Sequence, residues 1–163
     1  MDRFLPLHDG VVYEYDTRAS SGLPGIMTIQ VENTDERHVE LAFGGRRESL
    51  VVGADGARYA DGGYLLKTPL TLGNSWDGRN GVERVVAKDV EITVPAGHFD
   101  GCIRTEENDR SRTSSTTSSV FCPYVGLVLF EVKSNLVHES AALRRFGPRT
   151  DPLVGESPEL AAE

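Results

Sequence analysis

The chain has 163 residues, the usual size of one domain, and a formal net charge of −8 at pH 7 from 25 acidic and 17 basic residues. This charge repels phosphate backbones and anionic lipid at long range, so we expect no nucleic-acid partner. There is no transmembrane segment of roughly 20 apolar residues and no signal-peptide-like apolar run at the start, so we expect a soluble protein. It would be cytoplasmic if Met1 is the native start, and exported or in the envelope if a leader has been removed.

Apolar and polar residues alternate in segment after segment, and this period of two is typical of β-strands with one buried face. Clear examples are Val11 to Tyr15, Met27 to Val31 and Val90 to Val94. Pairs such as Asn80-Gly81 and Asp100-Gly101 separate these runs, as in tight hairpins. The predicted strands are 11–17, 25–34, 37–44, 47–53, 57–60, 63–67, 82–95, 101–109, 115–122, 126–133 and 138–145.

About ten strands without helices to cover them must bury their apolar faces against one another. The sequence therefore predicts an all-β domain over residues 1–146. Its antiparallel meander would close into a barrel, half-barrel or sandwich with little or no helix. Residues 147–163 contain prolines, a few glycines and scattered acids without periodicity, which predicts a C-terminal tail that is flexible or docked on the surface.

Two segments indicate how the chain turns between strands. Pro95 cannot donate an N–H to a sheet, so it should end the preceding strand, and Ala96-Gly97 allows a turn before Phe99 folds back onto the core. Gly73 and Trp76 likewise predict a turn followed by a large core anchor, whose indole N–H needs a partner if it is buried.

Four short motifs follow one another along the chain. They are Phe4-Leu5-Pro6-Leu7 leading to Tyr13-Glu14-Tyr15, the run Pro69 to Trp76 (PLTLGNSW), the run Val94 to Cys102 (VPAGHFDGC), and Pro123 to Val128 (PYVGLV). In this order they resemble an uncharacterised family of small bacterial β-rich proteins, many of them envelope lipoproteins. The signature positions are Trp76, Val94, Pro95, Gly97, Phe99, Pro123 and Gly126.

That resemblance implies an antiparallel, barrel-like fold and carries no catalytic assignment. The chain departs from the family pattern at Cys122, where a small residue is more usual. It also lacks a lipoprotein leader, so an envelope location does not follow from the resemblance.

Cys102 and Cys122 are the two cysteines of the chain. A hairpin turn near Arg112 would set them opposite each other, which makes a cross-strand disulfide geometrically plausible. Such a bond would close a loop of about 20 residues and stabilise the fold by roughly 3 kcal/mol. A pair of buried, reduced thiols is the alternative, favoured by the lack of any sign of an oxidising compartment.

No motif predicts a catalytic residue, a cofactor or a metal site. The histidines form no ligand pair, and a site built from His98, Cys102 and Cys122 would lack a fourth ligand, so we interpret His98 as a plain turn residue. The segment from Gly73 to Gly78 is one residue too long for a nucleophile elbow. All four histidines stand far apart: His8, His38, His98 and His138.

An acidic stretch, Glu106, Glu107 and Asp109, precedes a tract of serine and threonine. It could bind calcium or a polyanion, but alternating charges and hydroxyls more simply keep an exposed hairpin soluble.

Because catalytic motifs are absent, our leading hypothesis is a non-catalytic, barrel-like module that binds an apolar small molecule, a lipid or a protein partner. The first alternative is a structural or interaction subunit with a filled core. The second is an enzyme whose site is assembled from distant strands. The interior of the barrel distinguishes these hypotheses, since it can be filled, empty and apolar, or polar and charged.

Overall fold

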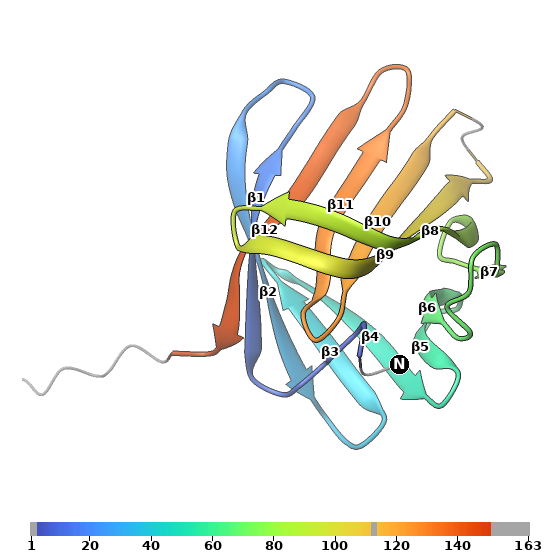
Figure 1. Ribbon diagram of the computed structural model, residues 1–163. Coiled ribbons are helices and arrows are strands. Elements are labelled where there is room, and N and C mark those ends of the chain that lie inside the picture. The colour runs from blue at the N-terminus through green and yellow to red at the C-terminus, as the bar shows by residue number, and fades with distance from the viewer. Residues whose placement is uncertain (1–2, 112–113, 151–163) are drawn as a thin grey trace, which may run out of the picture.

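The computed structural model describes residues 3–111 and 114–150, which form twelve β-strands and no helix (Figure 1). Nothing in this part of the chain is a helix long and apolar enough to cross a membrane. The strands are β1 (Val11–Arg18), β2 (Pro24–Asn33), β3 (His38–Phe43), β4 (Arg46–Gly53), β5 (Gly56–Tyr59), β6 (Tyr64–Lys67), β7 (Ser75–Asp77), β8 (Gly81–Val94), β9 (Gly97–Asp109), β10 (Thr116–Cys122), β11 (Gly126–Lys133) and β12 (His138–Pro148).

All strands belong to one antiparallel sheet that nearly closes into a barrel (Figure 1). Neighbours in sequence pair with each other, and β1 also pairs with β12, so the sheet order is β6-β5-β4-β3-β2-β1-β12-β11-β10-β9-β8-β7. The predicted all-β meander is therefore confirmed, and its form is barrel-like. Its two edge strands, β6 and β7, come from the middle of the chain and not from its ends.

Three strands differ from the sequence prediction by more than one residue. Ser75–Asp77 forms the short strand β7 where we expected only a turn and an anchor, and β9 begins at Gly97 instead of residue 101. At the C-terminus, β12 continues to Pro148, which pairs with Val11, so the sheet includes the first two residues of the expected tail. Residues 151–163 of that tail lie outside the described residues.

One end of the barrel interior is filled by a cluster of buried apolar side chains. Trp76 is 6% exposed and serves as the predicted core anchor, although its indole Nε1 has no hydrogen-bond partner among the described residues. Leu5, from the segment before β1, packs in the same cluster and so closes this end. The cluster consists of Leu5, Ala57, Leu66, Trp76, Val85, Ile103 and Phe121.

The distal half of the β8–β9 hairpin leaves the barrel and lies over β12 (Figure 1); we call residues 90–102 the outer arm. Register shifts between Val85 and Ile92, with Asp89 at a φ of 52°, bend the hairpin at its root. The Ala96 N–H donates to the Leu143 carbonyl, 2.9 Å away. β8 ends at Val94, and the chain turns through Pro95 and Ala96 before β9 begins at Gly97. Pro95 therefore directly follows the end of the strand, as predicted.

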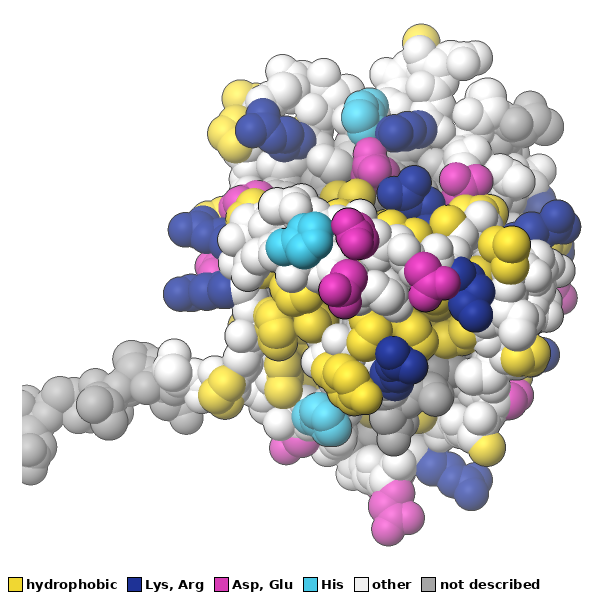
Figure 2. Space-filling view, in the orientation of Figure 1, with side chains coloured by type: hydrophobic (Ala, Val, Ile, Leu, Met, Phe, Trp, Pro, Cys, Tyr) yellow, Lys and Arg dark blue, Asp and Glu magenta, His cyan; other side chains and the backbone are white. Residues whose placement is uncertain are grey.

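The face seen in Figure 2 includes this arm, and charged side chains are scattered there among apolar ones. Beneath the arm, β10 is buried at four consecutive residues, 119–122. A strand with interior on one side and the arm on the other has no exposed face, so its burial is continuous.

A disulfide joins Cys102 to Cys122 at the base of the outer arm. The register between β9 and β10 is the one expected for a turn near Arg112, with Thr116 opposite Asn108 and Phe121 opposite Ile103. Both cysteines are fully buried. The structure thus has the disulfide and not the reduced pair that the sequence favoured, and this bond fixes the point where the arm leaves the sheet.

The seam between the two edges of the sheet depends on a close approach of two glycines. A Cβ on Gly63, just before β6, would lie 2.2 Å from the carbonyl oxygen of Gly78, just after β7. We expect Gly63→Ala to lower the free energy of unfolding by roughly 1–3 kcal/mol more than Gly62→Ala, through steric overlap. Gly62 is the matched control because its φ is also positive and a Cβ there meets nothing within 4 Å. Urea unfolding of both variants tests the prediction, and equal losses would contradict it.

Candidate functional site

A cavity of about 490 Å³ occupies the barrel interior, and every strand except β7 contributes a side chain to its wall. Most of the wall is apolar: Tyr15, Met27, Ile29, Leu41, Phe43, Tyr59, Leu65, Leu127, Phe130 and Ala141. The remaining lining residues are Arg46, Glu48, Arg79, Glu83, Glu107, Thr117 and Ser119. The cavity therefore combines an apolar wall with a set of polar and charged groups.

The polar residues of β8, β9 and β10 lie in register across the sheet. Glu83 is directly opposite Glu107, and Glu107 is directly opposite Thr117. Each glutamate is only 7% exposed. Two like charges directly opposite each other destabilise an antiparallel pair, so this arrangement lowers the stability of the fold. Residues that lower stability in this way are candidates for a functional role.

Glu107 has a structural role in this pair. Its Oε1 accepts hydrogen bonds from the backbone N–H groups of Asn80, at 2.5 Å, and Gly81, at 2.7 Å. The carboxylate thereby holds the turn between β7 and β8. Our expectation that Glu107 belongs to an exposed, solubilising hairpin is wrong, because its side chain points inward from β9 and is buried.

Glu83 has fewer partners. Its Oε1 accepts a hydrogen bond from Thr105 Oγ1 at 2.5 Å, and its Oε2 has no hydrogen bond with any described residue. Burial, with a smaller contribution from the charge of Glu107, raises the pKa of Glu83 to about 7 against the lowering effect of the Thr105 hydrogen bond. Near neutral pH this carboxyl group is poised between its neutral and charged forms.

Arg79 closes the wall of the cavity at the seam. It follows β7, yet its guanidinium contacts Glu48 Oε2 on β4 at 2.5 Å and Asp61 Oδ2, before β6, at 3.2 Å. It also lies over the ring of Tyr59, 4.7 Å from the centroid. The Glu48 hydrogen bond raises the pKa of Arg79, and burial raises the pKa of Tyr59, so both side chains keep their protons.

Comparison with known proteins bears on the fold. No family model matches the chain, and no curated protein is similar to it. A crystal structure from Bacteroides fragilis NCTC 9343, named for an exported protein with a YmcC-like fold, has a TM-score of 0.63 at 13% identity and covers 89% of this chain and 99% of its own. The fold is YmcC-like.

A second crystal structure is similar to this chain in fold, but less closely. It comes from Parabacteroides distasonis ATCC 8503 and is named as a lipoprotein, with a TM-score of 0.50, 14% identity, and coverage of 89% of this chain and 98% of its own. At such identities the likeness is one of fold alone. It supports the resemblance suggested by the four motifs at that coarser level.

The signature positions predicted from sequence do not line the cavity of this YmcC-like barrel. Val94, Pro95, Gly97 and Phe99 belong to the outer arm, while Pro123 lies in the turn between β10 and β11 and Gly126 begins β11. The cavity is lined instead chiefly by Tyr59, Arg79 and Glu83, which the sequence did not point to. Glu107, which was noted only as part of an acidic stretch, also lines it.

The histidines also lie away from the cavity. His98 Nδ1 is 2.8 Å from Thr93 Oγ1, and both cysteines are in the disulfide, so these three residues form no metal site. His38 pairs with Asp35 on the surface. Over the described residues, no group of three or more histidine, cysteine, aspartate or glutamate side chains is placed to hold a metal ion.

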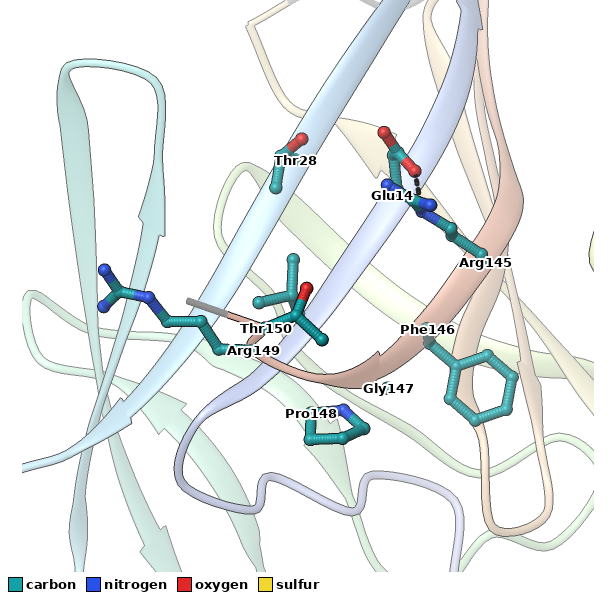
Figure 3. Close-up of a pocket in the computed structure, with 9 residues that line it drawn as sticks. Glu14, Thr28, Arg145, Phe146, Gly147, Pro148, Arg149 and Thr150 are labelled. Carbon is teal, nitrogen blue, oxygen red and sulfur yellow. Dashed lines mark ion pairs between the residues drawn. The ribbon is translucent and has the colours of Figure 1, made fainter. Parts of the chain in front are cut away.

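A second hollow of about 340 Å³ lies on the outside of the barrel, beside the end of β12 (Figure 3). Val12, Glu14 and Thr28 form one side, residues 145–150 form the other, and Glu14 is ion-paired with Arg145. The chain continues from here into residues that the structure does not describe. We therefore take the interior cavity, whose wall is fully described, as the candidate site.

Proposed function

We propose that the protein is a non-catalytic binding module that holds an apolar small molecule or a single lipid chain inside its barrel. The interior cavity of about 490 Å³ carries this proposal. Ligand sites in proteins are typically concave, roughly 300–1,000 Å³ in volume, and apolar with a few polar groups that fix orientation. The wall described above has this composition.

An apolar ligand would gain free energy chiefly by leaving water. Met27, Ile29 and Leu127 offer it aliphatic contacts, and Tyr15 and Phe43 offer aromatic ones. Each Å² of apolar surface removed from water contributes about 25 cal/mol. The polar groups of β8–β10 would then set which end of the ligand lies against them.

Filling the cavity should abolish binding without unfolding the barrel. Thr117 lines the cavity from β10, and Thr117→Phe places an aromatic ring there that suits a strand. We expect this variant to bind dodecanol at least about tenfold more weakly than the wild-type protein, as measured by isothermal titration calorimetry.

Ser118→Phe is the matched control, because the adjacent residue on a strand points to the opposite face. This control should bind like the wild type. If Thr117→Phe also binds like the wild type while its circular dichroism spectrum is unchanged, the ligand is not in this cavity.

An enzyme is the second candidate function, favoured by one observation. Glu83 and Glu107 are directly opposite each other, and a carboxyl group with a pKa of about 7 could act as a general acid. One oxygen of Glu107 already holds two backbone N–H groups, which leaves it less free to act as a base or nucleophile. Turnover of nitrophenyl esters or glycosides that is lost in Glu83→Gln would favour an enzyme over a binding module.

A purely structural subunit is less well supported, because its core should be filled and this barrel retains a cavity. Leu23 and Leu136 are exposed near the ends of the β1–β2 and β11–β12 hairpins, at 71% and 91%. Single exposed leucines are ordinary, and nothing in the structure shows what would cover them.

The protein is also proposed to work outside the cytoplasm. The buried disulfide between Cys102 and Cys122 supports this location, since such bonds persist in oxidising compartments. The names of the two solved structures, an exported protein and a lipoprotein, point the same way. This proposal replaces the cytoplasmic expectation, which depended on Met1 being the native start.

A further inference from the structure

We propose that the cavity takes a single-chain amphiphile with a protonated amine head group, and that Glu83 is the counter-ion of that head group. This inference rests on the proposed binding function and names its ligand class. Glu83 lines the cavity, is more than nine-tenths buried, and leaves Oε2 without a partner. An unpaired carboxylate oxygen on a buried side chain that lines a cavity is a place for a ligand donor.

The charge of Arg79 in the cavity wall is already neutralised by ion pairs. Arg79 is paired with Glu48 and Asp61, so its positive charge is compensated. Tyr59 lies under the Arg79 guanidinium and stays neutral, because burial raises its pKa.

Arg46 stacks on Phe43, 5.1 Å from the ring centroid, and its side chain is exposed to solvent at the edge of the cavity. The lining groups of β10, β11 and β12 carry no charge. The uncompensated charge that faces the cavity from β8 and β9 is therefore negative, from Glu83 and Glu107.

This charge distribution selects among head groups. A carboxylate head group would face two carboxyl groups and would be repelled. A hydroxyl head group could donate only one hydrogen bond. An ammonium group has three N–H donors and a full positive charge, and it would separate the two opposed carboxylates.

The size of the cavity limits the apolar part of the ligand. A volume of about 490 Å³ lies in the lower part of the range for drug-sized ligands, which suits one alkyl chain better than two. Dodecylamine has such a chain, and its amine is protonated at neutral pH, as that of lysine is.

Binding of an amine should release a proton from Glu83. Without ligand, burial and the charge of Glu107 keep part of the Glu83 population neutral near pH 7. A bound ammonium group favours the charged carboxylate, so the proton leaves to the buffer. Calorimetry in two buffers with different ionisation enthalpies measures this release directly.

The experiment compares dodecylamine, dodecanol and dodecanoate on the full chain, with the two ionic amphiphiles below their micelle concentrations and dodecanol below its solubility limit. We expect the wild-type protein to bind dodecylamine roughly tenfold or more tightly than dodecanol, because charge-assisted hydrogen bonds are about twice as strong as neutral ones. In Glu83→Gln this preference should disappear while dodecanol binding remains. Glu91→Gln, an exposed position on the same strand, is the matched control and should keep the preference.

The outcomes separate the two proposals. Equal binding of dodecylamine and dodecanol, or an unchanged preference in Glu83→Gln, would overturn the amine proposal and leave the binding function intact. Failure of all three amphiphiles to bind would overturn both. Glu83-dependent sedimentation with phosphatidylethanolamine vesicles, but not with phosphatidylcholine vesicles, would assign the site to membrane head groups and overturn the single-chain proposal.

Discussion

Replacing Cys102 and Cys122 by alanine is expected to lower the free energy of unfolding by about 3 kcal/mol. The disulfide closes a loop with a sequence separation of 20 residues, and the chain-entropy model gives a loss of this size when such a loop is opened. The bond also anchors the outer arm, so its removal should loosen the contact between Ala96 and Leu143. Urea unfolding measures the loss, and amide hydrogen exchange at Ala96 reports on the arm.

Wild-type protein in excess reductant is the control, because it keeps both sulfur atoms in the core. It should lose a similar amount of stability once the disulfide is reduced, whereas full stability in reductant would contradict the prediction. Protein isolated from its native host under alkylating conditions tests the proposed location. Two blocked thiols would show that the bond does not form there.

The fold could be predicted from local sequence features because they agree with one another. Alternation marked most strands, glycine and proline marked their ends, and the register of the β9–β10 hairpin followed from the position of its turn. The short strand β7 was missed, because Ser75–Asp77 is too short to show a period of two. The close approach of the two sheet edges, β6 and β7, depends on contacts between distant segments, such as Gly63 with Gly78, which one sequence does not display.

The candidate site was missed for a specific reason. In the predicted strand 82–95, the apolar residues Val90, Ile92 and Val94 occupy even-numbered positions. Because alternate residues point to opposite faces, the odd-numbered Glu83 would then lie on the exposed face. The register shifts between Val85 and Ile92 reverse this alternation, so Glu83 points inward with Val85. For Glu107 a signal was present, since it keeps the period of two set by the buried residues Ile103 and Thr105.

Glu83→Gln is expected to raise the free energy of unfolding by about 3 kcal/mol at pH 8. The pKa of Glu83 is raised from an ordinary value of 4.5 to about 7, chiefly by burial, and each pKa unit corresponds to about 1.4 kcal/mol. Between these two pKa values the folded protein binds more protons than the unfolded chain. Wild-type stability should therefore fall as the pH rises from 4.5 to 7 and stay lowered above pH 7, while a glutamine avoids this loss.

Urea unfolding of the wild type, Glu83→Gln and Glu91→Gln at pH 4.5 and pH 8 tests the sign as well as the size. The three proteins should be similarly stable at pH 4.5, where Glu83 is neutral, and only Glu83→Gln should gain at pH 8. A Glu83→Gln protein that is no more stable than the wild type at pH 8 would show that the buried carboxylate is already compensated inside the barrel. A buried carboxylate lowers stability at neutral pH, and its replacement by the isosteric glutamine raises stability, so the carboxylate does not serve folding. This result would therefore support a role of Glu83 in binding. Bound dodecylamine should therefore stabilise the wild-type protein more at pH 8 than it stabilises Glu83→Gln.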